Sequence, residues 1–364
     1  MSKIFYRIIN AKTLLVFILI LIIASIKYCH DQLNSSINWR SDETFVIESG
    51  TSLGGILKQL TSKDIVMTSE EFLLAYALLT NFRGALKAGE YDLSKTKTVA
   101  ELLALLRSGR VLERQITFIE GWTFEQWRNH LKTSPYINQE LGKLKNSEVM
   151  VIVAGKSELS PEGLFFPDTY RFTRGDSDIQ ILKRAHIKMI NVLEKEWGNR
   201  TIEGTLTNSY QALILASIIE SETGFMGDRG KVSQVFVNRL RRNIRLQSDP
   251  TVIYGLGKTF DGNLTKKDLR KPTQFNTYTN QGLPPTPIGM PSLASLRAAL
   301  HPEVGEYLYF VAKGDGTTHF SKTLAEHNLA VERYQRSGRP NNYKSAPQKR
   351  LLNELENKKG NTDG

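Results

Sequence analysis

Cysteine is almost absent from this chain, since its 364 residues include only Cys29. An intramolecular disulfide therefore cannot form, and a metal site built from several thiolates is excluded. The zinc-protease pattern His-Glu-x-x-His is also absent. His319 and His327 lie near Glu326, but a spacing of eight residues between the two histidines matches no zinc motif. We therefore predict neither a metal nor another cofactor.

A serine-hydrolase motif is missing as well. Ser221 is not flanked by glycines in the pattern Gly-x-Ser-x-Gly, so it lacks the sharp turn that exposes a hydrolase nucleophile. The chemistry of this chain must therefore rest on other side chains.

Acidic residues are scarce at both ends of the chain. The net charge is +11, but the first 30 residues contribute +4 and the last 32 contribute +5. The long central part is therefore close to neutral. A nucleic-acid-binding domain concentrates its positive charge on one face of the fold. This distribution argues against nucleic acid as a partner.

One long apolar run is present near the N-terminus. Residues 13–26 read TLLVFILILIIASI and carry no charge. This is shorter than the about 20 residues that a membrane span needs. Lys12 and Lys27 flank it, however, and long basic side chains can extend their ammonium groups to the two interfaces. The run is therefore predicted to cross a membrane as a single helix.

The charges around this run predict its orientation. Lys3 and Arg7 precede it, and the positive-inside rule places such an end in the cytoplasm. A cleaved signal peptide is the alternative, but no small-x-small cleavage site follows the run. In both interpretations the rest of the chain lies outside the cytoplasm. We predict a cytoplasmic end at 1–12, a single-pass anchor at 13–29 and a polar tether at 30–43.

Residues 44–113 combine strand-like and helical patterns. Phe45-Val-Ile alternates as a short strand, and apolar residues at helical spacing follow from Leu53 to Leu60. A second helix is predicted from Ser69 to Thr80, a strand at Gly89, and a helix capped by Thr98 and ended by Gly109. This order resembles the LysM module, which often binds glycans containing N-acetylglucosamine. The usual Gly-Asp-Thr of that module is Gly50-Thr51-Ser52 here, and a small packing domain without sugar binding is the alternative.

Residues 114–335 form a second predicted domain of mixed helices and strands. A strand at 115–119 leads through Gly121 into a helix, and a long amphipathic helix is predicted at 178–197. Past residue 336 the chain is polar and basic, which is typical of a disordered tail. The fold class is therefore predicted as α+β, with a membrane helix in front.

The helix predicted after Asn208 carries the most informative carboxyl group. Its sequence YQALILASIIESET is apolar up to Glu220. A carboxylate on an apolar face is partly desolvated when that face packs, which favours its protonated form. A glutamate that acts as a general acid needs this form. The alternative is that Glu220 marks the exposed end of a buried helix. The residues that share its face are Leu213, Ala216 and Ser217.

A polar, proline-rich segment follows at 275–292, reading FNTYTNQGLPPTPIGMPS. The prolines stiffen it, and its amide and phenol groups suit the hydroxyl and acetamido groups of sugars. An ordinary surface loop is the alternative. The substrate-binding side chains predicted here and nearby are Glu222, Asn238, Arg239, Gln247, Asp249, Tyr254, Asn276, Tyr278 and His319.

Six segments in this order carry a resemblance to a known family: SIIESET, VFVNRL, RLQSDPTVIYGLG, FNTYTNQGLPP, YLYFVA and THFSKTLAEHN. Together they resemble the endolytic murein transglycosylase (YceG-like) family, from the anchor to about Tyr334. This chain departs from the family's pattern at two positions that would affect the shape of the sugar-binding groove. Phe275 stands where tyrosine is common, and Thr286 stands where glycine is usual after the paired prolines.

The resemblance implies the reaction and the residue that performs it. The catalytic glutamate of the family falls on Glu220, and it would act as acid and then as base, so that nascent glycan strands are cut internally to 1,6-anhydromuramyl ends. It also implies a single-pass protein of the cytoplasmic membrane with a periplasmic catalytic domain and peptidoglycan synthases as partners. A hydrolase with Asp249 or Glu222 as second carboxylate, and a non-catalytic peptidoglycan-binding scaffold, are the alternatives. Glu222 is expected to face solvent or Arg229, and Asp249 to hold a turn before Pro250.

Overall fold

The computed structural model describes residues 2–337 except 41–42, 81, 83–85 and 223–225. The predicted tail, apart from its first two residues, lies outside the described residues. Within these residues the chain combines helices with three two-stranded sheets, so the α+β class is confirmed. Two compact units are present, and each is described by itself. Unit 1 contains Met1–Arg114, Tyr136–Asn138 and Arg171–Asp176, and unit 2 contains Gln115–Pro135, Gln139–Tyr170 and Ser177–Gly364.

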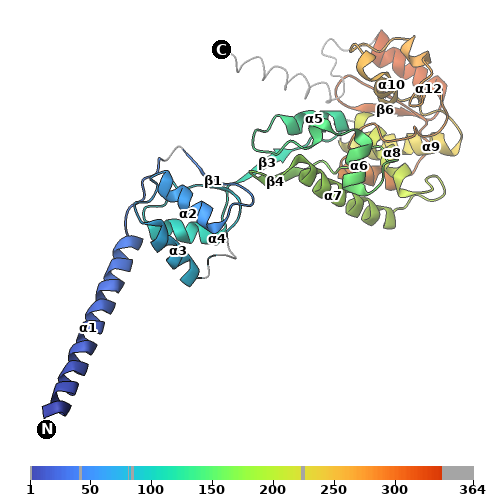
Figure 1. Ribbon diagram of the computed structural model, residues 1–364. Coiled ribbons are helices and arrows are strands. Elements are labelled where there is room, and N and C mark those ends of the chain that lie inside the picture. The colour runs from blue at the N-terminus through green and yellow to red at the C-terminus, as the bar shows by residue number, and fades with distance from the viewer. Residues whose placement is uncertain (1, 41–42, 81, 83–85, 223–225, 338–364) are drawn as a thin grey trace. The chain divides into compact units, whose positions relative to one another are not determined.

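Unit 1 begins with α1 (Ser2–Leu33), a single uninterrupted helix (Figure 1). Its part from Lys12 to Leu33 has a mean hydropathy of 2.2 and is not buried against the protein. Apolar side chains from Leu14 to Ile23 are exposed along it. Exposed apolar surface of this length is what a membrane span presents to lipid. The helix continues four residues past the predicted end of the anchor, to Leu33.

The rest of unit 1 follows the predicted order of elements. Strand β1 (Phe45–Ile47) pairs antiparallel with β2 (Gly89–Tyr91), and Phe45 lies opposite Tyr91. Each of its three helices has an N-cap whose side chain accepts the N–H of the residue three positions later. The predicted cap, Thr98, is one of them, and Ser52 and Ser69 are the others. Gly109 ends the last helix in the left-handed conformation, with φ 61°. These helices are α2 (Leu53–Ser62), α3 (Glu70–Leu79) and α4 (Val99–Ser108).

A buried charge joins two later segments to unit 1. Glu90 of β2 is 1% exposed and forms ion pairs with Arg114 and Arg174. A buried carboxylate without such partners would be costly, so the two arginines are required there. Arg114 lies in β3 (Glu113–Thr117) and Arg174 directly follows β4 (Thr169–Thr173), and these strands form the second sheet. The ion pair with Arg174 therefore ties the later segment Arg171–Asp176 to unit 1.

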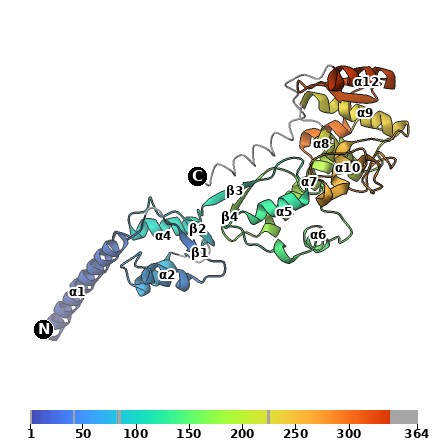
Figure 2. The ribbon, with the colours of Figure 1, turned by 90° about the horizontal axis from the view of Figure 1, so that it is seen from above.

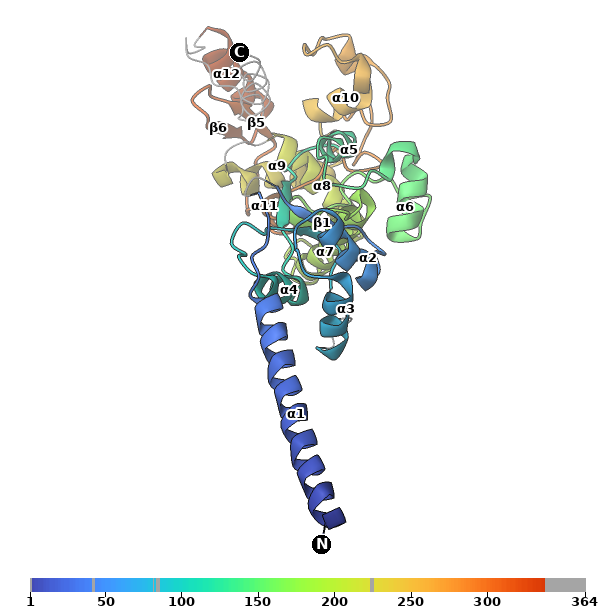
Figure 3. The ribbon, with the colours of Figure 1, turned by 60° about the vertical axis from the view of Figure 1, so that its left-hand side comes forward.

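Unit 2 is built around one buried helix. Every residue of α8 (Ser209–Glu222) from Ala212 to Glu220 is buried. Helices α7 (Asp178–Gly198), α9 (Arg229–Arg241), α10 (Asp249–Leu256) and α11 (Leu293–Leu300) pack against it, and Figure 3 shows α7, α9 and α11 around it. A helix that is buried all round needs apolar residues all round, which explains the unbroken run LILASII. The expectation that a single face packs was therefore too narrow.

The remaining elements of unit 2 surround this centre. Strands β5 (Tyr309–Ala312) and β6 (Thr318–Ser321) form an antiparallel hairpin, and α12 (Leu324–Val331) packs on it. The hairpin contacts α9 through the rings of Phe310 and Phe236, and Figure 2 shows α12 and α9 at the same end of unit 2. The other elements are α5 (Phe124–Lys132), η2 (Leu141–Lys143), α6 (Asn146–Ala154), η3 (Met226–Asp228), η4 (Gly257–Thr259), η5 (Asp268–Arg270) and η6 (Glu332–Arg336).

Two local expectations need correction. The turn predicted at Asp249 is the first turn of α10, because Pro250 sits at the start of a helix, where its missing N–H costs nothing. The strand predicted at 115–119 is β3 and begins two residues earlier, at Glu113.

Candidate active site

Glu220 lies near the C-terminal end of α8, and 6% of its surface is exposed. One carboxylate oxygen, Oε1, accepts a hydrogen bond from Nη2 of Arg229 at 3.0 Å. The other, Oε2, accepts from the backbone N–H of Ser292 at 2.9 Å and from the Ser292 hydroxyl. The carboxylate is therefore held at both oxygens by groups from two other helices.

Local structure fixes the two partners of Glu220. Arg229 is the first residue of α9, is 8% exposed, and donates from Nε to Oγ of Ser295 at 3.0 Å. Ser292 is the N-cap of α11, and its side chain accepts the Ser295 N–H at 3.1 Å. The carboxylate of Glu220 thus lies at the positive end of α11. Two helix N-terminal segments and one cation converge on one buried carboxyl group.

Burial and the hydrogen-bond donors act on the Glu220 carboxyl group in opposite directions. Hydrogen bonds and an arginine both favour the ionised carboxylate, whereas burial favours the protonated acid. The sequence indicated the burial but not the donors. Both oxygens of the Glu220 carboxyl group therefore accept hydrogen bonds in a buried setting.

A second carboxyl group, Glu120, reaches this site from far away in the sequence. Its segment is hydrogen-bonded to the one that precedes Ser292: Gly121 N donates to Met290 O at 2.7 Å, and Met290 N donates to Trp122 O at 2.8 Å. The Glu120 side chain is exposed. Partial desolvation raises its pKa, the negative charge of Glu220 raises it further, and Arg229 lowers it.

Sequence reasoning missed Glu120. The candidates considered for a second carboxylate, Glu222 and Asp249, both lie close to Glu220 in the chain, whereas Glu120 precedes it by 100 residues. No motif marks it, although Gly121, with φ 78°, indicates a sharp turn directly after it. Ser292 lay inside the predicted loop but was not singled out.

Glu222 is placed differently from the expectation. It does not pair with Arg229, which binds Glu220, but accepts a hydrogen bond from Oγ of Ser248 at 2.6 Å. Burial raises the pKa of Glu222 to about 7, with a further increase from the charge of Asp249 and a decrease from Arg239. Asp249 accepts from the hydroxyl of Tyr278 at 2.6 Å. It does not cap α10 with its side chain, as the turn-holding role would require.

The structure therefore brings together five of the predicted binding residues. Gln247 lies beside Tyr278, because the Gln247 N–H donates to Thr277 O at 3.1 Å. The backbone of Gln247 is left-handed, with φ 51°. The side chains of Gln247 and Asp249 are exposed. The five residues are Glu222, Arg239, Gln247, Asp249 and Tyr278.

Three predicted binding residues use their side chains to hold backbone. Each of Asn238, Arg239 and Asn276 donates two hydrogen bonds to main-chain carbonyls, at 2.7–3.1 Å. Asn276 has no exposed surface, and Arg239 is 7% exposed. These groups fix the loops around the site, and we do not propose the buried Asn276 as a contact of the substrate.

Tyr254 and His319 have other partners. The Tyr254 hydroxyl donates to Glu162, a residue that the sequence did not single out. Burial raises the pKa of Glu162 to about 7 although Phe124 N–H also donates to it. His319 is in β6, and its ring lies 5.7 Å from that of Tyr334.

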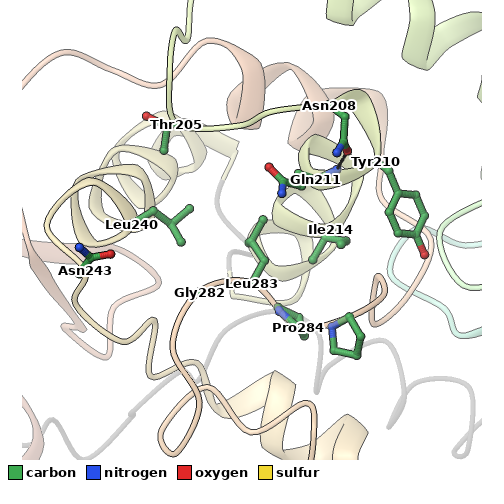
Figure 4. Close-up of a pocket in the computed structure, with 11 residues that line it drawn as sticks. Thr205, Asn208, Tyr210, Gln211, Ile214, Leu240, Asn243, Gly282, Leu283 and Pro284 are labelled. Carbon is green, nitrogen blue, oxygen red and sulfur yellow. Dashed lines mark hydrogen bonds between the residues drawn. The ribbon is translucent and has the colours of Figure 1, made fainter.

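A hollow of about 490 Å³ lies at the other end of α8 (Figure 4). Tyr210, Gln211 and Ile214 line it from α8, and residues 282–285 line it from the proline-rich segment. That segment then follows α8 toward Glu220, because Ile288 N donates to Ser217 Oγ at 3.0 Å and Ser292 binds Glu220. The predicted rigid loop thus connects the hollow with the carboxyl group.

This chain is similar to several known proteins. A protein of Bacillus subtilis (strain 168) named endolytic murein transglycosylase is 34% identical over 307 residues, which are 79% of this chain and 83% of that protein. Proteins of the same name from two strains of Streptococcus pneumoniae are 26% identical over 72% of this chain and 53% of their own length. A crystal structure of a yceG-like protein from Listeria monocytogenes, 30% identical, covers 81% of this chain and 99% of its own, with a TM-score of 0.49. Residues 45–333 match the YceG-like family, and the chain belongs to it.

Proposed function

We propose that this chain is a membrane-anchored peptidoglycan lytic transglycosylase in which Glu220 is the catalytic acid and base. The observation that carries the proposal is the buried Glu220 carboxylate, which Arg229 and Ser292 hold in a fixed position. A fixed, partly desolvated carboxyl group is what proton transfer to and from a sugar oxygen requires. Membership of the YceG-like family supports the substrate class.

The proposed reaction uses one proton and no water. Protonated Glu220 gives its proton to the glycosidic oxygen of the β-1,4 bond between N-acetylmuramic acid and N-acetylglucosamine, and the N-acetylglucosamine side leaves as an alcohol. The C6 hydroxyl oxygen of the muramyl residue then bonds to its C1 atom, and Glu220 takes up the hydroxyl proton. The acid is regenerated, and the strand ends in a 1,6-anhydro ring. We propose that such cuts within nascent strands end their elongation.

Digestion of purified glycan strands tests this function. The parental protein is expected to release internal fragments with anhydromuramyl ends, which are lighter by one water than reducing ends. Glu220→Gln keeps the size of the side chain but cannot donate or accept the proton, so it should fold and not cleave. Glu158→Gln, at an exposed glutamate of the same unit, is the matched control. Reducing ends would instead indicate the two-carboxylate hydrolase, and intact strands with the parental protein would indicate the scaffold.

We propose further that α1 anchors the protein in the cytoplasmic membrane with its N-terminus inside. The rest of unit 1 and all of unit 2 would then face the cell wall. Synthases of the glycan would then be close partners. The basic residues before the apolar run and the exposed apolar surface of α1 support this. The protein should remain in membranes after alkaline washing and be open to protease from outside. A soluble mature form that starts after residue 27 would show a cleaved signal instead.

A further inference from the structure

The segment that contains Glu120 has a fixed place beside the catalytic carboxyl group. Two backbone hydrogen bonds tie Gly121 and Trp122 to Met290, and Ser292, two residues later, binds both Glu220 and the start of α11. Gly289 permits this approach, because a Cβ atom there would lie 2.6 Å from the carbonyl oxygen of Gly121. Glu120 is therefore held near Glu220 by main chain, and not by a flexible loop.

The side chain of Glu120 differs from its neighbours in being unused. It makes no hydrogen bond with the described residues and is exposed, whereas Phe118 and Phe124 on either side are buried. Nothing in the packing of unit 2 requires an acid at this position. The charges of Glu220 and Arg229 nevertheless reach it, because Glu220 raises the pKa of Glu120 and Arg229 lowers it.

We propose that Glu120 is a positioning residue for the reaction, whose negative charge opposes that of Arg229 and so favours the protonated form of Glu220. This inference rests on the function proposed above. Three charged groups then make up the site: Glu220 on α8, Arg229 on α9 and Glu120 before α5. Ser292 of the α11 N-cap adds neutral donors.

The charges of these three groups explain why one proton is retained. With both glutamates ionised and Arg229 positive, the site has a net charge of −1. One added proton makes the site neutral. Two ionised carboxyl groups repel each other, so a site with both glutamates binds this proton more tightly than a site with a single carboxyl group and an arginine would. When Glu220 carries the proton, Glu120 remains as the counter-ion of Arg229. Glu220 can then donate as an acid although its direct partners favour the carboxylate.

The test is the pH dependence of strand cleavage by the full-length protein in detergent. A general acid loses activity as pH rises, because the proton is lost. Glu120→Gln removes the opposing charge, so this alkaline limb should move to lower pH by roughly one unit. At a pH above the alkaline midpoints of both profiles, the variant should then cleave about tenfold more slowly than the parent. At low pH the two rates should converge. Glu120→Asp, which keeps the charge, should restore most of the parental profile, and Glu158→Gln should not shift it.

Each outcome separates this proposal from the proposed function. Superimposable profiles of Glu120→Gln and the parent would overturn the role of Glu120 and leave Glu220 as the acid. An equal loss at every pH would also overturn it, since such a loss indicates direct contact with the substrate. Cleavage by neither the parent nor any variant would refute the function itself. Equal midpoints of thermal unfolding for Glu120→Gln and the parent would show that the shift is not a folding defect.

Discussion

Glu162 offers a quantitative test of the electrostatics inside unit 2. Its carboxyl group is 7% exposed, and it accepts the Phe124 N–H at 3.1 and 3.2 Å and the Tyr254 hydroxyl. Both donors lower its pKa, but burial outweighs them and raises the pKa from 4.5 to about 7. The folded protein therefore keeps a proton on Glu162 under conditions in which the unfolded chain releases it.

The sign of the resulting pH dependence follows from proton binding. Between pH 4.5 and about 7 the folded state binds more protons at this site than the unfolded state, so the free energy of unfolding falls as pH rises through this window. Below pH 4.5 both states are protonated and the contribution is fully present. A pKa difference of one unit corresponds to about 1.4 kcal/mol, so ionised Glu162 lowers the stability by about 3 kcal/mol at pH 8.

Glu162→Gln removes the ionisation and keeps an acceptor of the same size. The variant loses one of two acceptor oxygens, which costs about 1 kcal/mol at any pH. At pH 8 it avoids the ionisation penalty and should be more stable than the parent by about 2 kcal/mol. At pH 4.5 it should be less stable by about 1 kcal/mol. Glu222, whose pKa is also raised to about 7, is present in both proteins and cancels from the difference.

Urea-induced unfolding in detergent at the two pH values measures this difference. Tryptophan fluorescence reports mainly on unit 2, because three of the four tryptophans lie there, among them Trp127, which is buried and stacked on Phe118 at 3.7 Å. Glu158→Gln, at an exposed site, should show the same small effect at both pH values. A stability difference between Glu162→Gln and the parent that does not change with pH would refute the assignment of a buried, protonated Glu162.

Two further changes probe the contacts around Glu220. Gly289→Ala places a Cβ atom 2.6 Å from Gly121 O, so the two backbone segments must separate, and we expect a loss of about 1–3 kcal/mol in unfolding free energy together with reduced cleavage. Gly142→Ala meets no atom within 4 Å and is the control; equal stabilities of the two variants would contradict the close approach. Arg229→Gln leaves the buried Glu220 carboxylate without its cation, so the free energy of unfolding should fall by about 3 kcal/mol, measured by urea-induced unfolding at pH 8. A loss no larger than that caused by Glu158→Gln would argue against this ion pair.

Local sequence signals predicted the starts and ends of helices well, because these depend on only a few neighbouring residues. Ser69, Thr98 and Ser177 each cap a helix where the sequence placed its start, and Gly109 ends one. Such caps depend on a single side chain and the N–H groups next to it. The position of Glu220 at the end of a buried helix was predictable for the same reason, from the unbroken apolar run before it.

Contacts between distant segments could not be predicted in this way. Glu222 was expected to face solvent, but Ser248, which lies in a different loop, donates to it. Asn238 and Arg239 looked like binding groups, although their side chains hold the main chain at Gly305 and Leu308. The sequence does not show whether a polar side chain binds a substrate or a backbone carbonyl. The fold determines which of these partners it meets.

The candidate site shows why its chemistry exceeds what one motif can contain. The glutamate motif supplies Glu220, but the site also contains Arg229, which pairs with Glu220, and Glu120, which we propose opposes the charge of Arg229. These residues lie 9 positions after and 100 positions before Glu220 in the chain. They meet because α8 is buried on all sides, so that its last turn is reached by α9, by the N-terminus of α11 and by the strand-like segment paired with Met290. The burial of α8 therefore also brings Arg229 and Glu120 to the end of the helix that carries Glu220. If Glu120 acts as we propose, a change in the packing around α8 should alter the pH dependence of cleavage before it abolishes cleavage.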